Sequence, residues 1–149
     1  TEDQLDKAGV KMGAIIKKLP SKSSSFIQIQ TQVGSGVEVI TGVKYDASFG
    51  NIIMFGAGGI LAELIGDSNL KMLPIDEAGA RQLIAKSKVS KLLTGFRNQK
   101  SFALNKLATL LVKLGHLAES TDYFSEITIN PIIVTDKEAW AVDPRIILK

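Results

Sequence analysis

Residues 104–114 carry a leucine stripe that constrains the fold more than any other feature of the sequence. Its members share one face of an α-helix: Leu104, Leu107, Leu110, Leu111 and Leu114. Such a face needs an apolar surface to pack against, and strand-like patterns stand both before and after it. We therefore expect a helix from Ser101 that packs on a sheet.

The spacing of apolar residues in the rest of the sequence predicts the element order helix, strands, helices and hairpin. Helical spacing marks residues 1–20, with Thr1 and Gln4 placed as a capping box, and a second helix that Asp76 caps. Alternation or short apolar runs predict strands at 26–33, 37–45, 52–55, 60–65, 70–73, 124–135 and 139–148. The glycines at 34–36 favour a hairpin between the first two strands. The prediction is an α+β fold, a mainly antiparallel sheet with helices packed on one face, in a single domain over residues 1–149.

Composition excludes several classes of function. The 149 residues contain no cysteine and one histidine, His116, so thiol catalysis and a Cys/His metal cage are impossible within this chain. The net charge is only +3, and the single basic cluster at 86–91 is best interpreted as a solvated helix face, so no nucleic-acid partner is expected. No apolar run reaches the ~20 residues of a membrane span, and the N-terminus is acidic, so we expect no membrane association and a cytoplasmic location.

A glycine cluster at 56–59 invites comparison with phosphate-binding loops, because residues without Cβ let backbone N–H groups approach an anion. It lacks the Gly-Lys-Ser/Thr ending of a P-loop, and a strand-like segment follows where the dinucleotide fingerprint needs a helix. On the residues alone a tight turn is favoured. Glu63 and Asp67 follow at a spacing of four, which by itself is a weak signal.

The C-terminal hairpin carries the most informative polar pattern. If residues 136–137 form a two-residue loop, Asn130 lies across from Asp143 and Thr128 across from Arg145, on one polar face. Ile133 and Trp140 would then pair on the buried face. Amide and carboxylate oxygens can converge on Mg²⁺, which takes few protein ligands beside water and phosphates. A merely solvated polar face is the open alternative, and the residues alone favour it.

Several segments together resemble the ATP-grasp domain of the ADP-forming acyl-CoA (acetyl-CoA) synthetases, relatives of the succinyl-CoA synthetase β subunit. The matching segments, in chain order, are Gln30 with Gly36-Val37-Glu38 (hinge strand and acidic residue), Asp46-Ala47-Ser48-Phe49-Gly50 (D-x-x-F-G), Phe55-Gly56-Ala57-Gly58-Gly59 with Glu63 and Asp67 (F-G-x-G-G-x-x-x-E-x-x-x-D), Leu93-Thr94-Gly95-Phe96-Arg97 (L-x-G-x-R), Glu126-Ile127-Thr128-Ile129-Asn130-Pro131 (E-x-D-I-N-P) and Val142-Asp143 (D-A-R).

The resemblance implies an acid–CoA ligase (ADP-forming) that interconverts acyl-CoA, ADP and phosphate with free acid, CoA and ATP. The phosphoryl group would pass through a histidine on a separate CoA-binding domain or subunit, so no catalytic residue is expected in this chain. The implied cofactors are ATP/ADP and Mg²⁺. The implied nucleotide-binding residues are Gln30, Glu38, Gly58, Gly59 and Glu63, and the implied metal ligands are Asn130 and Asp143.

Three positions depart from the family pattern. Thr128 stands where the family carries an acidic residue that faces the phosphorylated histidine, Pro144 replaces a small residue, and Asn98 replaces a glycine. The first part of the family's lid, with the lysine that reaches the nucleotide phosphates, has no equivalent here, so we expect one part of a larger enzyme. The alternative is a degenerate, non-catalytic ATP-grasp remnant that serves as an assembly or regulatory module.

Overall fold

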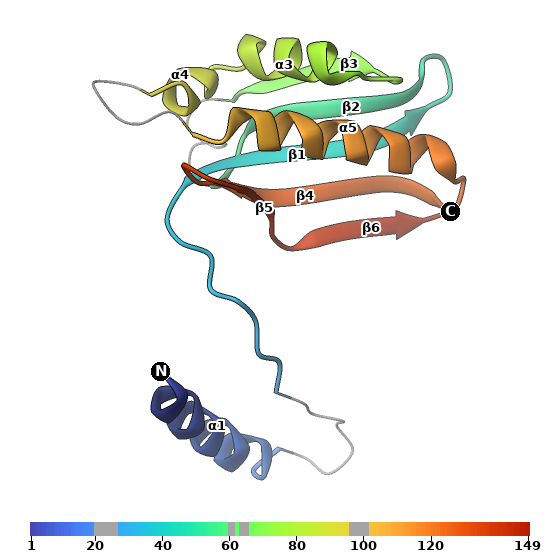
Figure 1. Ribbon diagram of the computed structural model, residues 1–149. Coiled ribbons are helices and arrows are strands. Elements are labelled where there is room, and N and C mark those ends of the chain that lie inside the picture. The colour runs from blue at the N-terminus through green and yellow to red at the C-terminus, as the bar shows by residue number, and fades with distance from the viewer. Residues whose placement is uncertain (20–26, 60–61, 63–65, 96–101) are drawn as a thin grey trace. The chain divides into compact units, whose positions relative to one another are not determined.

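The computed structural model of the protein (Figure 1) describes residues 1–19, 27–59, 62, 66–95 and 102–149. Contacts divide the chain into two compact units, Thr1–Gln32 and Val33–Lys149. The first unit contains α1 (Glu2–Ile16), which begins as predicted, with the Thr1 amino group donating to the Gln4 side-chain oxygen at 2.9 Å. No residue of α1 is buried.

The second unit is built on a six-stranded, entirely antiparallel sheet, which confirms the predicted fold class. The strand order is β3-β2-β1-β4-β5, and β6 also pairs with β4. The strands are β1 (Val37–Asp46), β2 (Gly50–Ala57), β3 (Ser68–Met72), β4 (Phe124–Val134), β5 (Ala139–Ala141) and β6 (Pro144–Leu148). The turn between β1 and β2 closes because Asp46 Oδ1 accepts hydrogen bonds from the Ser48 and Phe49 N–H groups, at 2.8 and 3.0 Å.

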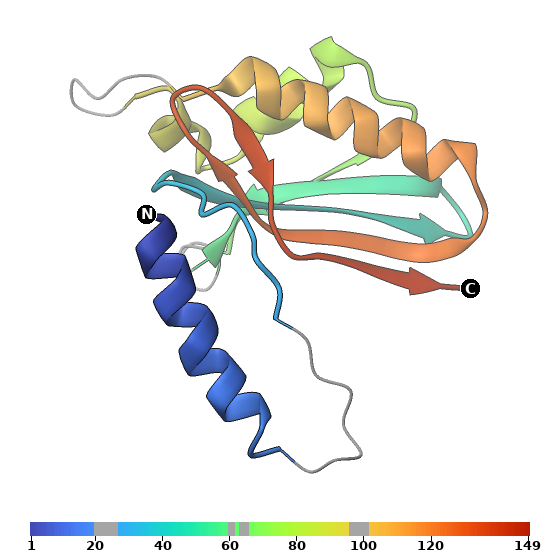
Figure 2. The ribbon, with the colours of Figure 1, turned by 60° about the horizontal axis from the view of Figure 1, so that its bottom comes forward.

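Two longer helices, α3 (Glu77–Lys86) and α5 (Leu104–Ser120), lie on the same side of this sheet (Figure 2), with the short α4 (Ser90–Leu93) between them in sequence. Asp76 caps α3 as predicted, accepting the Gly79 N–H at 2.7 Å. Of the leucine stripe of α5, Leu107, Leu111 and Leu114 are buried, and Leu107 and Leu111 are fully enclosed; Leu104 and Leu110 are half-buried. The helix begins at Leu104; the expected start, Ser101, lies outside the described residues.

Strand alternation gives the sheet two chemically different faces. The face under the helices presents the fully buried Val39, Ile53 and Phe55. The opposite face, called the far face below, presents residues of mixed polarity: Gly42, Lys44, Ile52, Met54, Leu70, Glu126 and Thr128. Among the described helices, none is long and apolar enough to cross a membrane.

The prediction of a strand at 26–33 paired with β1 is wrong for the residues that the structure describes. Residues 27–36 form neither helix nor strand. Because β1 pairs with β2 along one edge and with β4 along the other, it has no edge left for a hairpin partner. Alternating glutamines fit a strand pattern but cannot supply a partner.

The strand expected at 60–65 is wrong at Ala62, the one described residue in that range, which is helical like Gly59. The Gly66 N–H donates to the Ala62 carbonyl at 3.1 Å, a helical spacing. The described residues after β2, Gly59 and Ala62, are therefore helical and not extended. Short apolar runs do not distinguish strand from helix by periodicity alone.

The C-terminal hairpin has the predicted register, with Thr128 across from Arg145 and Ile133 across from Trp140. The single expected strand at 139–148 is instead split into β5 and β6, around Asp143, whose φ is 52°. Trp140 is not buried: 43% of its surface is exposed.

A β-bulge in β4 explains the exposure of Trp140. Val39 pairs with Ile132 but Thr41 pairs with Ile129, so two residues of β4, Asn130 and Pro131, oppose one residue of β1. The extra residue inverts the alternation beyond it. The buried residues change from Ile127 and Ile129 to Ile132 and Val134, and Ile133 and Trp140 move to the far face.

Candidate functional site

Glu38 and Gly59 form the first part of the candidate site. Glu38 stands near the start of β1 with an exposed side chain, and its carbonyl accepts the Gly58 N–H at 3.0 Å. Gly59 has a φ of 54°, and a β-carbon placed on it would overlap Oε2 of Glu38. Glycine favours this backbone conformation, and only a residue without a β-carbon allows this approach of the carboxylate.

The other glycines of the cluster pack against backbone. A β-carbon on Gly58 would lie 2.7 Å from the Val39 carbonyl carbon, and one on Gly56 would overlap the Asp67 carbonyl oxygen. The segment from Gly56 to Gly59 is therefore pressed against β1 on one side and against the start of β3 on the other. This close packing fixes the position of the turn.

Asn130 and Asp143 form the second part. Both are exposed and lie where the β4 ladder is interrupted, between the pairs Ile129–Pro144 and Ile132–Ala141. The Val142 N–H still donates to the Pro131 carbonyl across the gap, at 3.0 Å. The register thus places Asn130 and Asp143 opposite each other, as the sequence predicted, at a break in the ladder that the sequence did not predict.

The two parts share the far face of the sheet. Glu38 in β1 pairs with Ile133 in the neighbouring strand β4, and the bulge formed by Asn130 and Pro131 ends two residues before Ile133. Gln30 belongs to the first unit, as an exposed residue of the segment that lacks regular structure. Glu63, the remaining expected nucleotide ligand, lies outside the described residues.

A cavity of about 430 Å³ lies on the far face, beyond the bulge. One wall is apolar and includes Met54 and Leu70; the other contains Lys44, Glu126 and Thr128. The Thr128 hydroxyl donates to Glu126 Oε1 at 3.1 Å, and Lys44 pairs with Glu126 in the strand register. The β1–β4 pairing brings Lys44 here, which sequence reasoning missed because it paired β1 with residues 26–33.

Asp67, from the glycine-cluster signature, is buried with 8% of its surface exposed. Burial alone would raise the pKa of its carboxyl group. Hydrogen bonds from the Ser87 hydroxyl, the Lys88 and Val89 backbone and the Asn69 side chain outweigh burial, and together they lower the pKa below its usual value. The carboxylate is therefore charged, and the groups that donate hydrogen bonds to it belong to the fold itself.

Comparison with known proteins gives consistent matches. A model of the ATP-grasp domain family matches residues 1–148. The β subunit of an ADP-forming acetate–CoA ligase I from Pyrococcus furiosus is 40% identical over 113 residues, covering 76% of this chain and 49% of the relative. The ADP-forming 4-hydroxybutyrate–CoA ligase from Nitrosopumilus maritimus is 34% identical, covering 74% of this chain and 16% of the relative.

A solved structure agrees with these sequence matches. It is the dinucleotide-forming acetyl-coenzyme A synthetase 1 of Ca. Korarchaeum cryptofilum, in complex with coenzyme A and Mg-AMPPCP, with its phosphohistidine segment pointing towards the nucleotide-binding site. The TM-score is 0.74 at 35% identity, over 78% of this chain and 55% of that one. This chain spans about half the length, or less, of the curated relatives it matches. The chain belongs to the ATP-grasp domain family, with the ADP-forming acyl-CoA synthetases as its matched relatives.

Proposed function

We propose that this chain is the nucleotide-binding part of an ADP-forming acyl-CoA synthetase, which couples the interconversion of acyl-CoA and free acid to ADP and ATP. The observation that carries the proposal is the joint placement of Glu38, the glycine turn and the Asn130–Asp143 pair on one face of one sheet, in a chain of this family. The matched relatives are named as ligases, and nothing in the comparisons supports a degenerate remnant.

Glu38, Gly58 and Gly59 would bind the nucleotide, with Gln30 and Glu63 as further ligands carried by the resemblance. A carboxylate accepts hydrogen bonds from hydroxyl groups, and a residue without a β-carbon, such as the half-buried Gly59, lets phosphate oxygens approach the backbone. The chain's share of catalysis would be positioning, because phosphoryl transfer depends mainly on in-line geometry and charge stabilisation.

Asn130 and Asp143 fit a Mg²⁺ ion. Both offer hard oxygen atoms from exposed side chains at facing positions, and Mg²⁺ usually takes one or two protein ligands beside water and phosphate. Within the described ranges, no three His, Cys, Asp or Glu residues gather into a metal cage, and this type of site does not need one. When bound, the ion would neutralise charge on the phosphate oxygens.

The proposed partner is a CoA-binding domain or subunit that carries the phosphorylated histidine. The Korarchaeum structure, which holds coenzyme A and has such a segment directed towards its nucleotide site, supports this assignment. The location in the cytoplasm stays a prediction from composition.

Calorimetry with Mg²⁺ and ADP tests the proposed site. Asp143→Asn should weaken Mg-ADP binding by about tenfold or more, since even partners outside the first ligand sphere are worth about 10–100-fold. The free energy of unfolding should change by less than about 0.5 kcal/mol, because the carboxylate is exposed.

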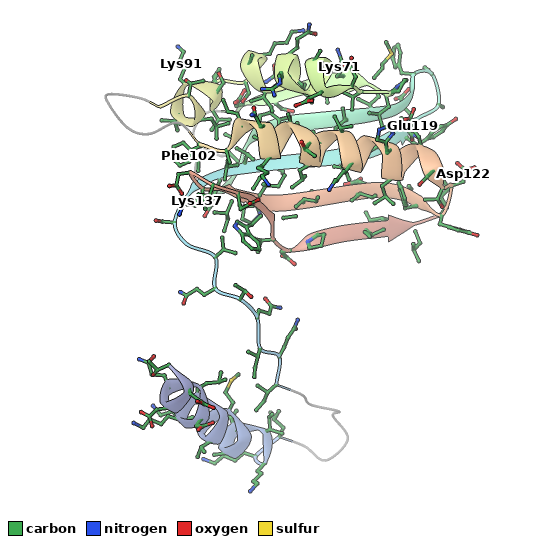
Figure 3. The ribbon with its side chains drawn as sticks, viewed as in Figure 1. Lys71, Lys91, Phe102, Glu119, Asp122 and Lys137 are labelled. Atoms are coloured by element: carbon green, nitrogen blue, oxygen red, sulfur yellow. The ribbon has the colours of Figure 1, made fainter. Side chains whose placement is uncertain are left out.

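Asp122→Asn is the matched control. It removes one exposed carboxylate just before β4 begins, at the opposite end of that strand from the β4–β5 turn that contains Lys137 (Figure 3). It should leave Mg-ADP affinity unchanged. Equal affinity in wild type and Asp143→Asn would remove Asp143 from the metal site, and no binding of Mg-ADP or Mg-ATP by the wild type, with or without a CoA-binding partner, would contradict the proposed function.

A further inference from the structure

Asp67 is the one buried charged residue in the part of the chain that the structure describes. It stands directly before β3, and the proposed function assigns it no contact with ligand. A buried carboxylate is costly unless it is hydrogen-bonded, so its partners indicate what the fold gains from it. These partners come from a different part of the chain than the glycine turn.

The carboxylate of Asp67 holds the corner between α3 and α4. Oδ2 accepts hydrogen bonds from the Ser87 hydroxyl and, at 3.1 Å, from the Val89 N–H. The Lys88 backbone is a further donor, and the Asn69 amide donates to Oδ1 at 3.1 Å. Val89 is fully buried. The negative charge thus satisfies consecutive backbone donors at a point where α3 has ended and α4 begins.

The backbone of Asp67 holds the glycine turn. Its carbonyl oxygen lies where a β-carbon of Gly56 would be, and the next residue, Ser68, pairs with Gly56 in the β2–β3 ladder. Gly58 then contacts the Val39 backbone, and Gly59 contacts the Glu38 carboxylate. From Asp67 to Val39 the contacts are backbone against backbone, with no side chain between that could absorb a displacement, and only the last contact, from Gly59 to Glu38, involves a side chain.

We propose that Asp67 is a positioning residue for the nucleotide site: it locks the glycine turn, and through it Glu38, to the α3–α4 corner. The expected effect on nucleotide binding rests on the proposed function. The positioning of the glycine turn and Glu38 by Asp67 does not. The α3–α4 corner leads through Leu93 into Gly95, so Asp67 joins two of the sequence signatures that resemble the family.

Asp67→Asn is the informative variant. An amide has the same shape but only one acceptor oxygen. If that oxygen takes the Oδ2 position, the amide nitrogen faces the Asn69 donor, and if the nitrogen takes it, the Ser87 and Val89 donors lose their acceptor. Ser87→Ala removes one donor and keeps the charge, so it should give a smaller effect in the same direction. Asp76→Ala is the matched control, because it also removes a carboxylate that accepts a backbone N–H but has no contact with Gly56.

Two measurements on the full chain separate positioning from plain stability. The first is the position of the Gly58 and Gly59 backbone amide signals in nuclear magnetic resonance spectra of the ligand-free protein. The second is the Mg-ADP dissociation constant, measured by calorimetry at a temperature where every variant is fully folded. A role in stability alone would lower the melting temperature and move neither readout.

We expect Asp67→Asn to shift the Gly58 and Gly59 signals and to raise the Mg-ADP dissociation constant about tenfold. Asp76→Ala should change neither. If Asp67→Asn does not fold, Ser87→Ala decides by the same two readouts. Unshifted Gly58 and Gly59 signals overturn the proposal. Shifted signals in a protein whose wild type binds no Mg-nucleotide would keep the positioning role and contradict only the proposed function.

Discussion

The Oε2 atom of Glu38 occupies the space in which a β-carbon of Gly59 would lie. A carboxylate from β1 and a residue just after β2 are thus in direct contact, although 21 positions separate them in the sequence. We derive two predictions for the nucleotide site from this contact.

Gly59→Ala should displace the Glu38 carboxylate and strain the backbone at a φ of 54°. The left-handed conformation costs a residue with a β-carbon about 1–2 kcal/mol. We expect urea unfolding to show a loss of that order and calorimetry to show a loss of Mg-ADP binding. The control is Gly34→Ala, because nothing lies within 4 Å of its β-carbon. A Gly59→Ala protein with wild-type affinity would show that the contact has no part in binding.

Glu38→Gln keeps the shape of the side chain and removes its charge. Hydrogen bonds to charged groups are worth about 1.5–3 kcal/mol, so Mg-ADP affinity should fall by about 10-fold or more. Stability should change little, because the side chain is exposed. Equal titrations for Glu38→Gln and wild type would leave Glu38 without a ligand contact.

Gly56→Ala should be the most destabilising single methyl addition in the glycine cluster. Its β-carbon would overlap the Asp67 carbonyl oxygen, which belongs to the backbone and cannot rotate away. Overpacking of this kind costs about 1–3 kcal/mol, measurable as a shift in the midpoint of urea unfolding. A midpoint equal to that of Gly34→Ala would mean that β3 moves freely relative to β2.

The stability of the protein should depend on pH through Asp67. Its pKa is lowered in the folded state, so its contribution is fully present above the pKa of the unfolded chain, about 3.9, and is lost as the pH falls through the folded value. The difference in unfolding free energy between wild type and Asp67→Asn should be constant above about pH 5 and shrink below about pH 4. A difference that stays constant down to pH 2 would mean that the charge contributes nothing.

Trp140→Ala should cost about 1–2 kcal/mol, less than the ~3–5 kcal/mol of a fully buried aromatic residue, because 43% of the indole surface is exposed. Leu107→Ala, at a fully buried position, should cost about 2–5 kcal/mol. Thermal unfolding of both variants checks the order. A larger loss for Trp140→Ala would indicate that the bulge does not turn this side chain to the far face.

The sequence predicts the structure correctly where the structure depends on residues within one short segment. Leu107 and Leu111 define the buried face of α5, and the loop at 136–137 fixes the register of the C-terminal hairpin. Trp140 was misplaced because a bulge adds a residue without a clear sequence signal, and the alternation beyond it changes face.

The pairing of β1 with a distant strand is the other feature that the sequence pattern does not predict. The glutamines at 28–32 and the neighbouring 37–45 segment suggested a local hairpin, whereas β1 pairs with β4, some 90 residues later. Nothing local in β1 selects that partner, because the choice depends on burying Val39 and Ile132 under the helices. The cavity wall that joins Lys44 to Glu126 depends on the same long-range pairing, and only the three-dimensional structure reveals it.

Because β1 lies between β2 and β4, it fixes the distance between these two strands on the far face. Adjacent strands lie about 4.7–4.9 Å apart, so β2 and β4 are separated by roughly 10 Å with a single hydrogen-bonded strand between them. That spacing is a property of backbone ladders and does not change when core side chains are trimmed. Substitutions at Leu107 or Leu111 can therefore weaken the protein as a whole while the gap between the glycine turn and Asn130 keeps its width, and evolution can adjust stability and ligand geometry in this fold independently.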